Sequence, residues 1–74
     1  SKRTTREKLM AYLLQQAKKY QSDCFEIPYN RQELADYLEV DRSGLSVEIG
    51  KLCKQGIIRA DRKKFTIIQQ RNQL

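Results

Sequence analysis

The stretch from Asn30 to Gly56 constrains the fold of this chain most, because it has the pattern of two short amphipathic helices joined by a tight turn. Asn30 is a favourable N-cap for the first helix, and Glu33, three residues later, completes a variant of the capping box. Asp41 can cap the second helix, where its carboxylate also complements the helix dipole. Gly56 suits the left-handed backbone position that follows a helix. The stretch therefore predicts a helix-turn-helix.

A leading helix is predicted over residues 6–20, where apolar side chains recur at helical spacing after the possible caps Thr4 and Thr5. One buried stripe is expected, with Tyr12 away from its centre. The stripe consists of Leu9, Met10, Leu13, Leu14 and Ala17. Basic amphipathic helices can also lie on membranes, but this stripe is narrow and lacks an aromatic anchor, so a core helix is predicted.

Short β-prone segments predict a small antiparallel sheet. Residues 24–27 favour an extended segment that can pair at a sheet edge, and Pro28 prevents a helix from continuing there. Residues 57–58 and 65–68 favour two strands, and the basic segment 59–64 between them favours a turn. These two strands and their turn predict a β-hairpin after the second helix of the pair.

The predicted fold class is α+β and mainly helical, a winged helix-turn-helix with three helices and a small antiparallel β-hairpin wing. One domain is expected over residues 1–74, because a chain of 74 residues is near the lower limit for a single stable core. The helix-turn-helix is expected at about residues 30–56 and the wing at about residues 57–68.

Charge alternates along the chain. The net charge is +6 and the pI is about 9.6, which favours a polyanionic partner. Residues 1–21 and 42–74 are strongly basic, whereas residues 22–41 carry six acidic side chains and one basic side chain. The alternation favours distinct functional surfaces, although an ordinary solvated surface is the alternative interpretation.

The sequence contains none of the constellations that enzymes require. It has no histidine, no glycine-rich phosphate loop, and two cysteines, Cys24 and Cys53, without metal-like spacing. We therefore expect no enzymatic activity, no metal and no cofactor in this domain. Both thiols are expected to be reduced, with a disulfide or redox switch as the alternative. No apolar run is long enough for a membrane-spanning helix, so a cytoplasmic protein without a membrane partner is expected.

The second helix of the pair has two different sides when residues are placed at about 100° intervals around its axis. Its core side is expected to consist of Leu45, Ile49 and Leu52. Its outward side carries cations and small residues but no carboxylate, and consists of Ser43, Val47, Gly50 and Lys54. Arg42 lies in the first turn, where its long side chain can extend past the helix end.

This outward side is typical of a helix that reads the major groove of DNA. Arginine binds O6 and N7 of guanine in bidentate fashion, and small residues permit close approach. The predicted base contacts are Arg42, Ser43 and Val47, although an exposed Val47 can also be unremarkable surface rather than a contact to a thymine methyl. Phosphate contacts are predicted mainly from cations of the second helix and the wing. They are Arg31, Ser46, Lys51, Lys54, Arg59, Arg62, Lys63 and Lys64.

The segments RQELADYL and VDRSGLS, followed by a lysine-containing helix and GII, resemble the C-terminal DNA-binding domain of the Crp/Fnr transcription regulators. The resemblance implies sequence-specific binding of duplex DNA for transcription regulation, and base contacts from the positions of Arg42, Ser43 and Val47. It also implies a homodimer on a pseudo-palindromic operator. The family's N-terminal effector domain and dimerisation helix are expected to be absent from this chain, which is then expected to be a weakly binding monomer.

Two positions depart from the family pattern. The family often has arginine where this chain has Val47, so one polar base contact is expected to be missing. Glycine is common in the turn at the position of Glu39, which predicts a positive φ angle and strain on the order of 1 kcal/mol there.

A protein-interaction module is the alternative function, because winged-helix folds also serve as docking surfaces. An acidic patch could support such contacts, with RNA polymerase as a candidate partner, or could be a solvated face. It consists of Glu33, Asp36, Glu39 and Asp41.

Overall fold

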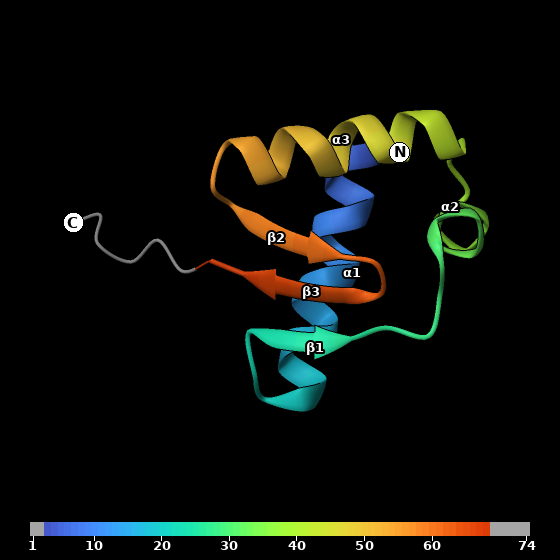
Figure 1. The fold of residues 1–74 in the computed structure, drawn as a ribbon. Coiled ribbons are helices and arrows are strands. Elements are labelled where there is room, and N and C mark those ends of the chain that lie inside the picture. The colour runs from blue at the N-terminus through green and yellow to red at the C-terminus, as the bar shows by residue number, and fades with distance from the viewer. Residues whose placement is uncertain (1–2, 69–74) are drawn as a thin grey trace.

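Three helices and a three-stranded antiparallel sheet make up residues 3–68, the part of the chain that the computed structural model describes (Figure 1). In chain order the elements are α1 (Thr5–Tyr20), β1 (Cys24–Glu26), α2 (Arg31–Leu38), α3 (Arg42–Lys54), β2 (Ile58–Asp61) and β3 (Lys64–Ile67). This arrangement confirms the predicted α+β winged helix-turn-helix. The ends of the predicted domain, residues 1–2 and 69–74, lie outside the described residues.

The sheet has the order β1-β3-β2, so β3 is its central strand. Phe25 of β1 pairs with Phe65 of β3, and Ala60 of β2 pairs with the same Phe65 from the other side. In Figure 1, α3 lies along the β2 edge and α1 crosses behind the sheet. The extended segment predicted before Pro28 therefore does pair at the edge of the sheet.

The hairpin turn is shorter than the sequence predicted. Residues 59–64 were expected to form it, but the turn consists only of Arg62 and Lys63, and Arg59 and Lys64 lie in paired strands. The basic residues do not interrupt the strand pairing because their side chains are exposed, while the small Ala60 is half-buried opposite Phe65. The cations therefore extend along the hairpin rather than gathering in one loop.

Helix α1 begins with a complete capping box. The hydroxyl of Thr4 accepts a hydrogen bond from the backbone N–H of Glu7 at 3.1 Å, and the Glu7 carboxylate accepts one from the backbone N–H of Thr4 at 2.9 Å. The predicted stripe was partly wrong, because Tyr12 is buried and Leu14 is 54% exposed. The buried side is rotated toward Tyr12, whose ring packs 5.4 Å from the ring of Tyr37.

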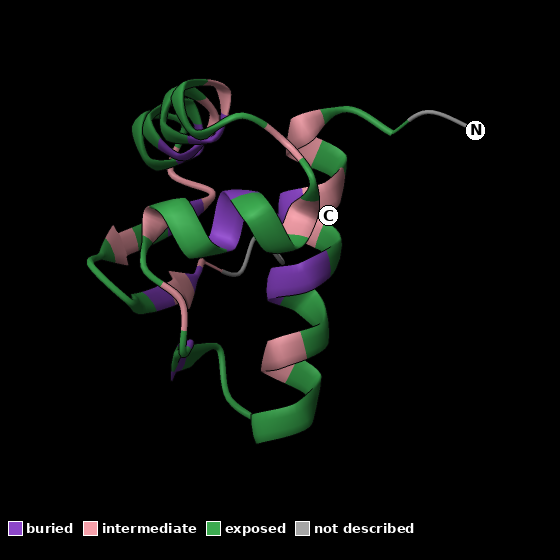
Figure 2. Ribbon diagram, turned by 90° about the vertical axis from the view of Figure 1, so that its right-hand side faces the viewer, coloured by how far each residue is buried: buried purple, intermediate pink, exposed green. Residues whose placement is uncertain are grey.

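One hydrophobic core joins the sheet to all three helices, and the buried positions face inward on each helix (Figure 2). The predicted core side of α3 is confirmed, since Leu45, Ile49 and Leu52 are all buried. The full set of buried apolar residues is Leu9, Tyr12, Leu13, Phe25, Ile27, Leu34, Ala35, Leu45, Ile49, Leu52, Ile58, Phe65 and Ile67. Within residues 3–68, no helix has both the length and the apolar character to cross a membrane.

The turn between α2 and α3 has the predicted positive φ angle. Glu39 adopts φ 61° and ψ 48°, the left-handed conformation that favours glycine. The half-buried Val40 follows, and its N–H donates to the carbonyl of Ala35 at 3.0 Å. This geometry fixes the angle at which α3 leaves α2.

Replacing Glu39 with glycine is expected to raise the free energy of unfolding by about 0.5–1 kcal/mol, because glycine adopts this backbone conformation without a Cβ penalty. The Glu39→Ala variant is the matched control, since it removes the same carboxylate but keeps the Cβ atom. Urea denaturation of both variants measures the difference. Equal stability of the two variants would assign any gain to the lost charge and contradict the backbone explanation.

Candidate nucleic-acid interface

Helix α3 is held by its buried side and presents its opposite side to solvent. Ser43, Ser46, Val47, Gly50 and Lys54 are all exposed, and Val47 is 54% exposed. No heavy atom lies within 4 Å of the position that a Cβ atom on Gly50 would occupy. The outward side of α3 is therefore an open surface of small side chains, free to approach another molecule closely.

The first turn of α3 is fixed by its cap. The Asp41 carboxylate accepts a hydrogen bond from the backbone N–H of Gly44 at 2.8 Å. Arg42 follows immediately, and its exposed guanidinium makes no hydrogen bond or ion pair with any described residue. This cation is therefore available to a ligand without first breaking an internal contact.

Contacts between α1 and α3 fix the orientation of the outward side. Arg6 of α1 contacts Glu48 at 3.1 Å and also donates to the side chain of Gln55 at 3.0 Å. Lys51 lies 3.8 Å from the same Glu48 carboxylate. The predicted phosphate contact Lys51 thus has an internal partner at long distance, whereas the side chain of Lys54 makes no hydrogen bond or ion pair with the described residues.

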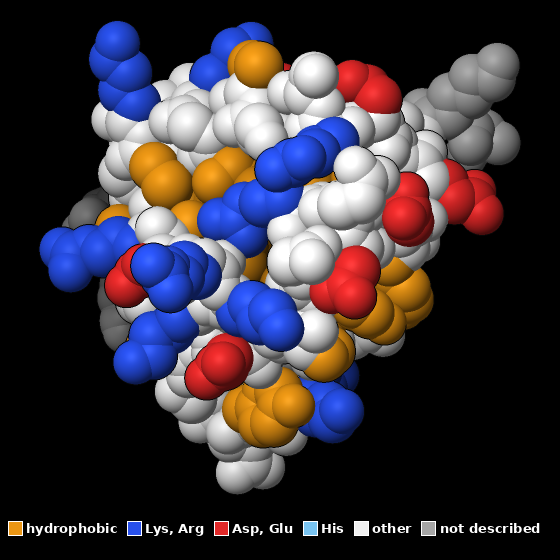
Figure 3. Space-filling view, turned by 45° about the vertical axis from the view of Figure 1, so that its right-hand side comes forward, with side chains coloured by type: hydrophobic (Ala, Val, Ile, Leu, Met, Phe, Trp, Pro, Cys, Tyr) orange, Lys and Arg blue, Asp and Glu red, His pale blue; other side chains and the backbone are white. Residues whose placement is uncertain are grey.

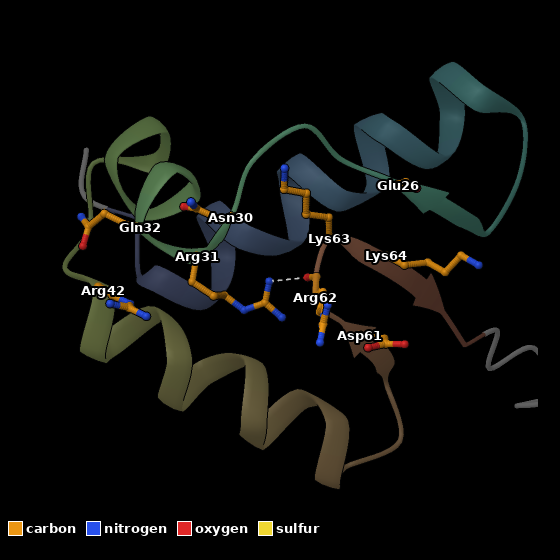
Figure 4. Close-up of a pocket in the computed structure, with 9 residues that line it drawn as sticks. All are labelled: Glu26, Asn30, Arg31, Gln32, Arg42, Asp61, Arg62, Lys63 and Lys64. Carbon is orange, nitrogen blue, oxygen red and sulfur yellow. Dashed lines mark hydrogen bonds between the residues drawn. The ribbon is translucent and has the colours of Figure 1, made fainter.

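A hollow of about 860 Å³ lies between the start of α2, the start of α3 and the hairpin turn (Figure 4). Arg42 of α3 lines this hollow, and so do Arg62 and Lys63 of the hairpin turn. Five cations and two carboxylates line it, so its charge is net positive. The complete lining is Glu26, Asn30, Arg31, Gln32, Arg42, Asp61, Arg62, Lys63 and Lys64.

Arg31 lies inside this hollow and is half-buried. Its Nη1 donates a hydrogen bond of 2.7 Å to the backbone carbonyl of Arg62, and its guanidinium lies 5.1 Å from the centre of the Phe65 ring. Burial lowers the pKa of Arg31, an effect that nearby Cys53 partly opposes. No local pattern predicts this arrangement, because it depends on contacts between α2 and a hairpin about thirty residues further along the chain.

Arg59 does not join the hollow. It is exposed on β2 and lines a separate depression of about 450 Å³ together with Cys53. Lys64 lines both depressions, because it lies opposite Asp61 at the start of β3. Of the predicted phosphate contacts, Arg31, Arg62, Lys63 and Lys64 are brought together with Arg42. Arg59, Ser46, Lys51 and Lys54 lie elsewhere on the surface.

Many cations lie on the face of the molecule that Figure 3 shows. In Figure 3, Lys and Arg side chains cross the middle and left of the face, while carboxylates gather toward its right-hand edge, with a few among the cations. Asn30 and Gln32, which were not among the predicted contacts, line the hollow at the start of α2 and can donate hydrogen bonds to an anion. Their position just before and within the first turn of a helix was the signal that could have identified them.

The described residues contain no cluster of three or more His, Cys, Asp or Glu side chains that could hold a metal ion. Cys24 and Cys53 are both free and exposed. The chemistry of the interface is therefore that of cations, amides and backbone N–H groups, which bind anionic oxygen atoms.

The family described as the Crp-like helix-turn-helix domain matches residues 7–74, which cover all of α1 after its first two residues, both helices of the pair and the hairpin. No curated protein matches the chain significantly.

Proposed function

Because the chain belongs to the Crp-like helix-turn-helix domain family, a family of DNA-binding domains in transcription regulation, we propose that it binds duplex DNA sequence-specifically through α3. The outward side of α3 reads the major groove of one operator half-site. Arg42, Ser43 and Val47 contact base edges, with Arg42 bidentate to a guanine. The observation that carries this proposal is the exposed, internally unpaired Arg42 at the start of an open helix surface.

Cations around the reading helix bind the phosphate backbone and set its position on the duplex. The hollow beside Arg42 supports this role, since it gathers cations from α2 and the hairpin next to the start of α3. The proposed phosphate contacts are Arg31, Ser46, Lys51, Lys54, Arg59, Arg62, Lys63 and Lys64. These contacts supply affinity but carry little sequence information.

The operator is proposed to be pseudo-palindromic and to be bound by a homodimer of the full-length protein, with one domain on each half-site. A single domain has only one half-site to contact. It therefore binds weakly as a monomer, because it lacks the effective concentration that a linked second domain provides.

Salt dependence tests the proposal against a protein-docking role. If about six of the proposed phosphate contacts form together, the logarithm of the association constant falls with the logarithm of salt concentration with a slope of about −5. Fluorescence anisotropy with a labelled duplex between low and physiological salt measures this slope. An association constant that does not change with salt would contradict DNA binding through these phosphate contacts and favour a protein partner instead.

A further inference from the structure

We infer that Arg31 is the positioning residue of the wing: it joins the first turn of α2 to the hairpin and thereby fixes the turn that presents Arg62 and Lys63 beside Arg42. The inference rests on the proposed function and deepens it. It gives Arg31 a role in the free protein, before any contact with a phosphate is made.

Two contacts hold the Arg31 guanidinium in place. Its Nη1 donates to the Arg62 carbonyl at 2.7 Å, a short bond from a charged donor (Figure 4). Its planar group lies 5.1 Å from the ring of Phe65, which is fully buried in the central strand. The guanidinium therefore connects the exposed turn to a fixed point in the core.

The hairpin turn can gain from such a contact because its backbone is strained at a non-glycine residue. Arg62 has φ 58°, a left-handed conformation that non-glycine residues rarely adopt. The hydrogen bond to the Arg62 carbonyl fixes the orientation of the peptide group between Arg62 and Lys63. That orientation determines where the Arg62 and Lys63 side chains leave the backbone.

A second hydrogen bond holds the turn independently of any side chain. The backbone N–H of Ile27 donates to the carbonyl of Lys63 at 2.9 Å. Loss of the Arg31 side chain therefore leaves this bond and the pairing of β2 with β3 in place. The expected effect of removing Arg31 is a mobile turn on an otherwise folded domain.

Lysine at position 31 separates positioning from phosphate binding. A lysine keeps the positive charge, but its compact ammonium group lacks the planar fork of a guanidinium. It therefore cannot reproduce both the contact with the Phe65 ring and the hydrogen bond to the Arg62 carbonyl. Arg31→Lys therefore tests the arrangement of the guanidinium, and Arg31→Met tests loss of both charge and hydrogen bond. Lys54→Met serves as the matched control, because Lys54 is a proposed phosphate contact that lies outside the hollow.

Nitrogen-15 relaxation of the free protein gives a readout that does not depend on DNA. In both Arg31 variants we expect lower order parameters for the amides of the turn residues 62 and 63, with unchanged values for β3 residues 64–67 and for α3. The Lys54→Met control should leave the turn unchanged. Unaltered order parameters at residues 62 and 63 in both Arg31 variants would overturn the inference.

A double-mutant cycle on DNA binding then tests whether positioning matters for function. Neutralising Arg62 and Lys63 together should weaken DNA binding in the native background, and the factor by which binding weakens should be at least about fivefold smaller in the Arg31→Met background. Additive losses would overturn the functional part of the inference. If the unmodified chain shows no salt-dependent DNA binding, the proposed function fails, and the relaxation measurement still decides whether Arg31 fixes the turn.

Discussion

Replacing Arg42 with alanine is expected to weaken binding to the preferred duplex by about 1–3 kcal/mol and to relax discrimination at one base pair. The reason is that Arg42 has no internal partner among the described residues, so the loss reflects its contact with DNA rather than damage to the fold. Affinities for a panel of duplexes, each with one substituted base pair, measure both effects. Urea denaturation of the variant should show unchanged stability.

Lys54→Ala is the comparison for this experiment, because it removes a cation from the other end of the same helix. It should weaken binding about equally for every duplex of the panel, as expected for a phosphate contact. If Arg42→Ala also weakened all duplexes equally, Arg42 would be a phosphate contact and its assignment as a base reader would be wrong.

Neutralising the hairpin cations should have the second large effect. Replacing Arg62, Lys63 and Lys64 with glutamine removes three proposed phosphate contacts. The slope of the logarithm of the association constant against the logarithm of salt concentration should become less negative by about 2.7, or roughly 0.9 per contact. Preferred and random duplexes should be affected alike, because these residues position the protein without reading bases. Salt titrations of the native and variant proteins give the two slopes directly.

A second triple variant controls for net charge. Arg3, Lys18 and Lys19 lie in or before α1, outside the lining of the hollow, and their replacement with glutamine removes the same three charges. Its slope should stay close to that of the native protein. Equal changes in the two triple variants would show that binding responds to total charge and would argue against a localised interface.

The helix-turn-helix was predictable because its signals are local. Each of three signals acts within one helical turn, and the structure confirms each of them at a helix end. They are the capping pair of Asn30 and Glu33, the N-cap Asp41, and Gly56 after α3. The positive φ at Glu39 was also predictable, although from the family pattern rather than from local physics.

What the sequence could not predict depends on tertiary contacts. Helical spacing alone placed Leu14 in the core and Tyr12 outside it, because the pattern does not reveal that the rings of Tyr29 and Tyr37 form a site for Tyr12. In the same way, composition identified a cationic hairpin but not its two-residue turn. The hydrogen bond from Arg31 to that turn cannot be predicted without knowing how α2 is placed relative to the sheet.

The exposed Val47 leaves α3 with one fewer polar side chain for base contacts than the resemblance implies. Its 54% exposure is consistent with a groove-facing position, since the core side of the helix is filled by other residues. We expect this difference to alter which half-site is preferred rather than whether DNA is bound.

Selection of binding sites decides whether α3 reads base sequence in duplex DNA. Duplexes are selected from a random pool by the chain itself, and the affinity for the selected duplex is compared with that for a shuffled duplex of equal length and composition at the same salt concentration. If α3 reads bases, the selected duplex should bind at least about tenfold more tightly, which is roughly the discrimination that one base pair provides. Equal affinity for the two duplexes would contradict base reading by α3.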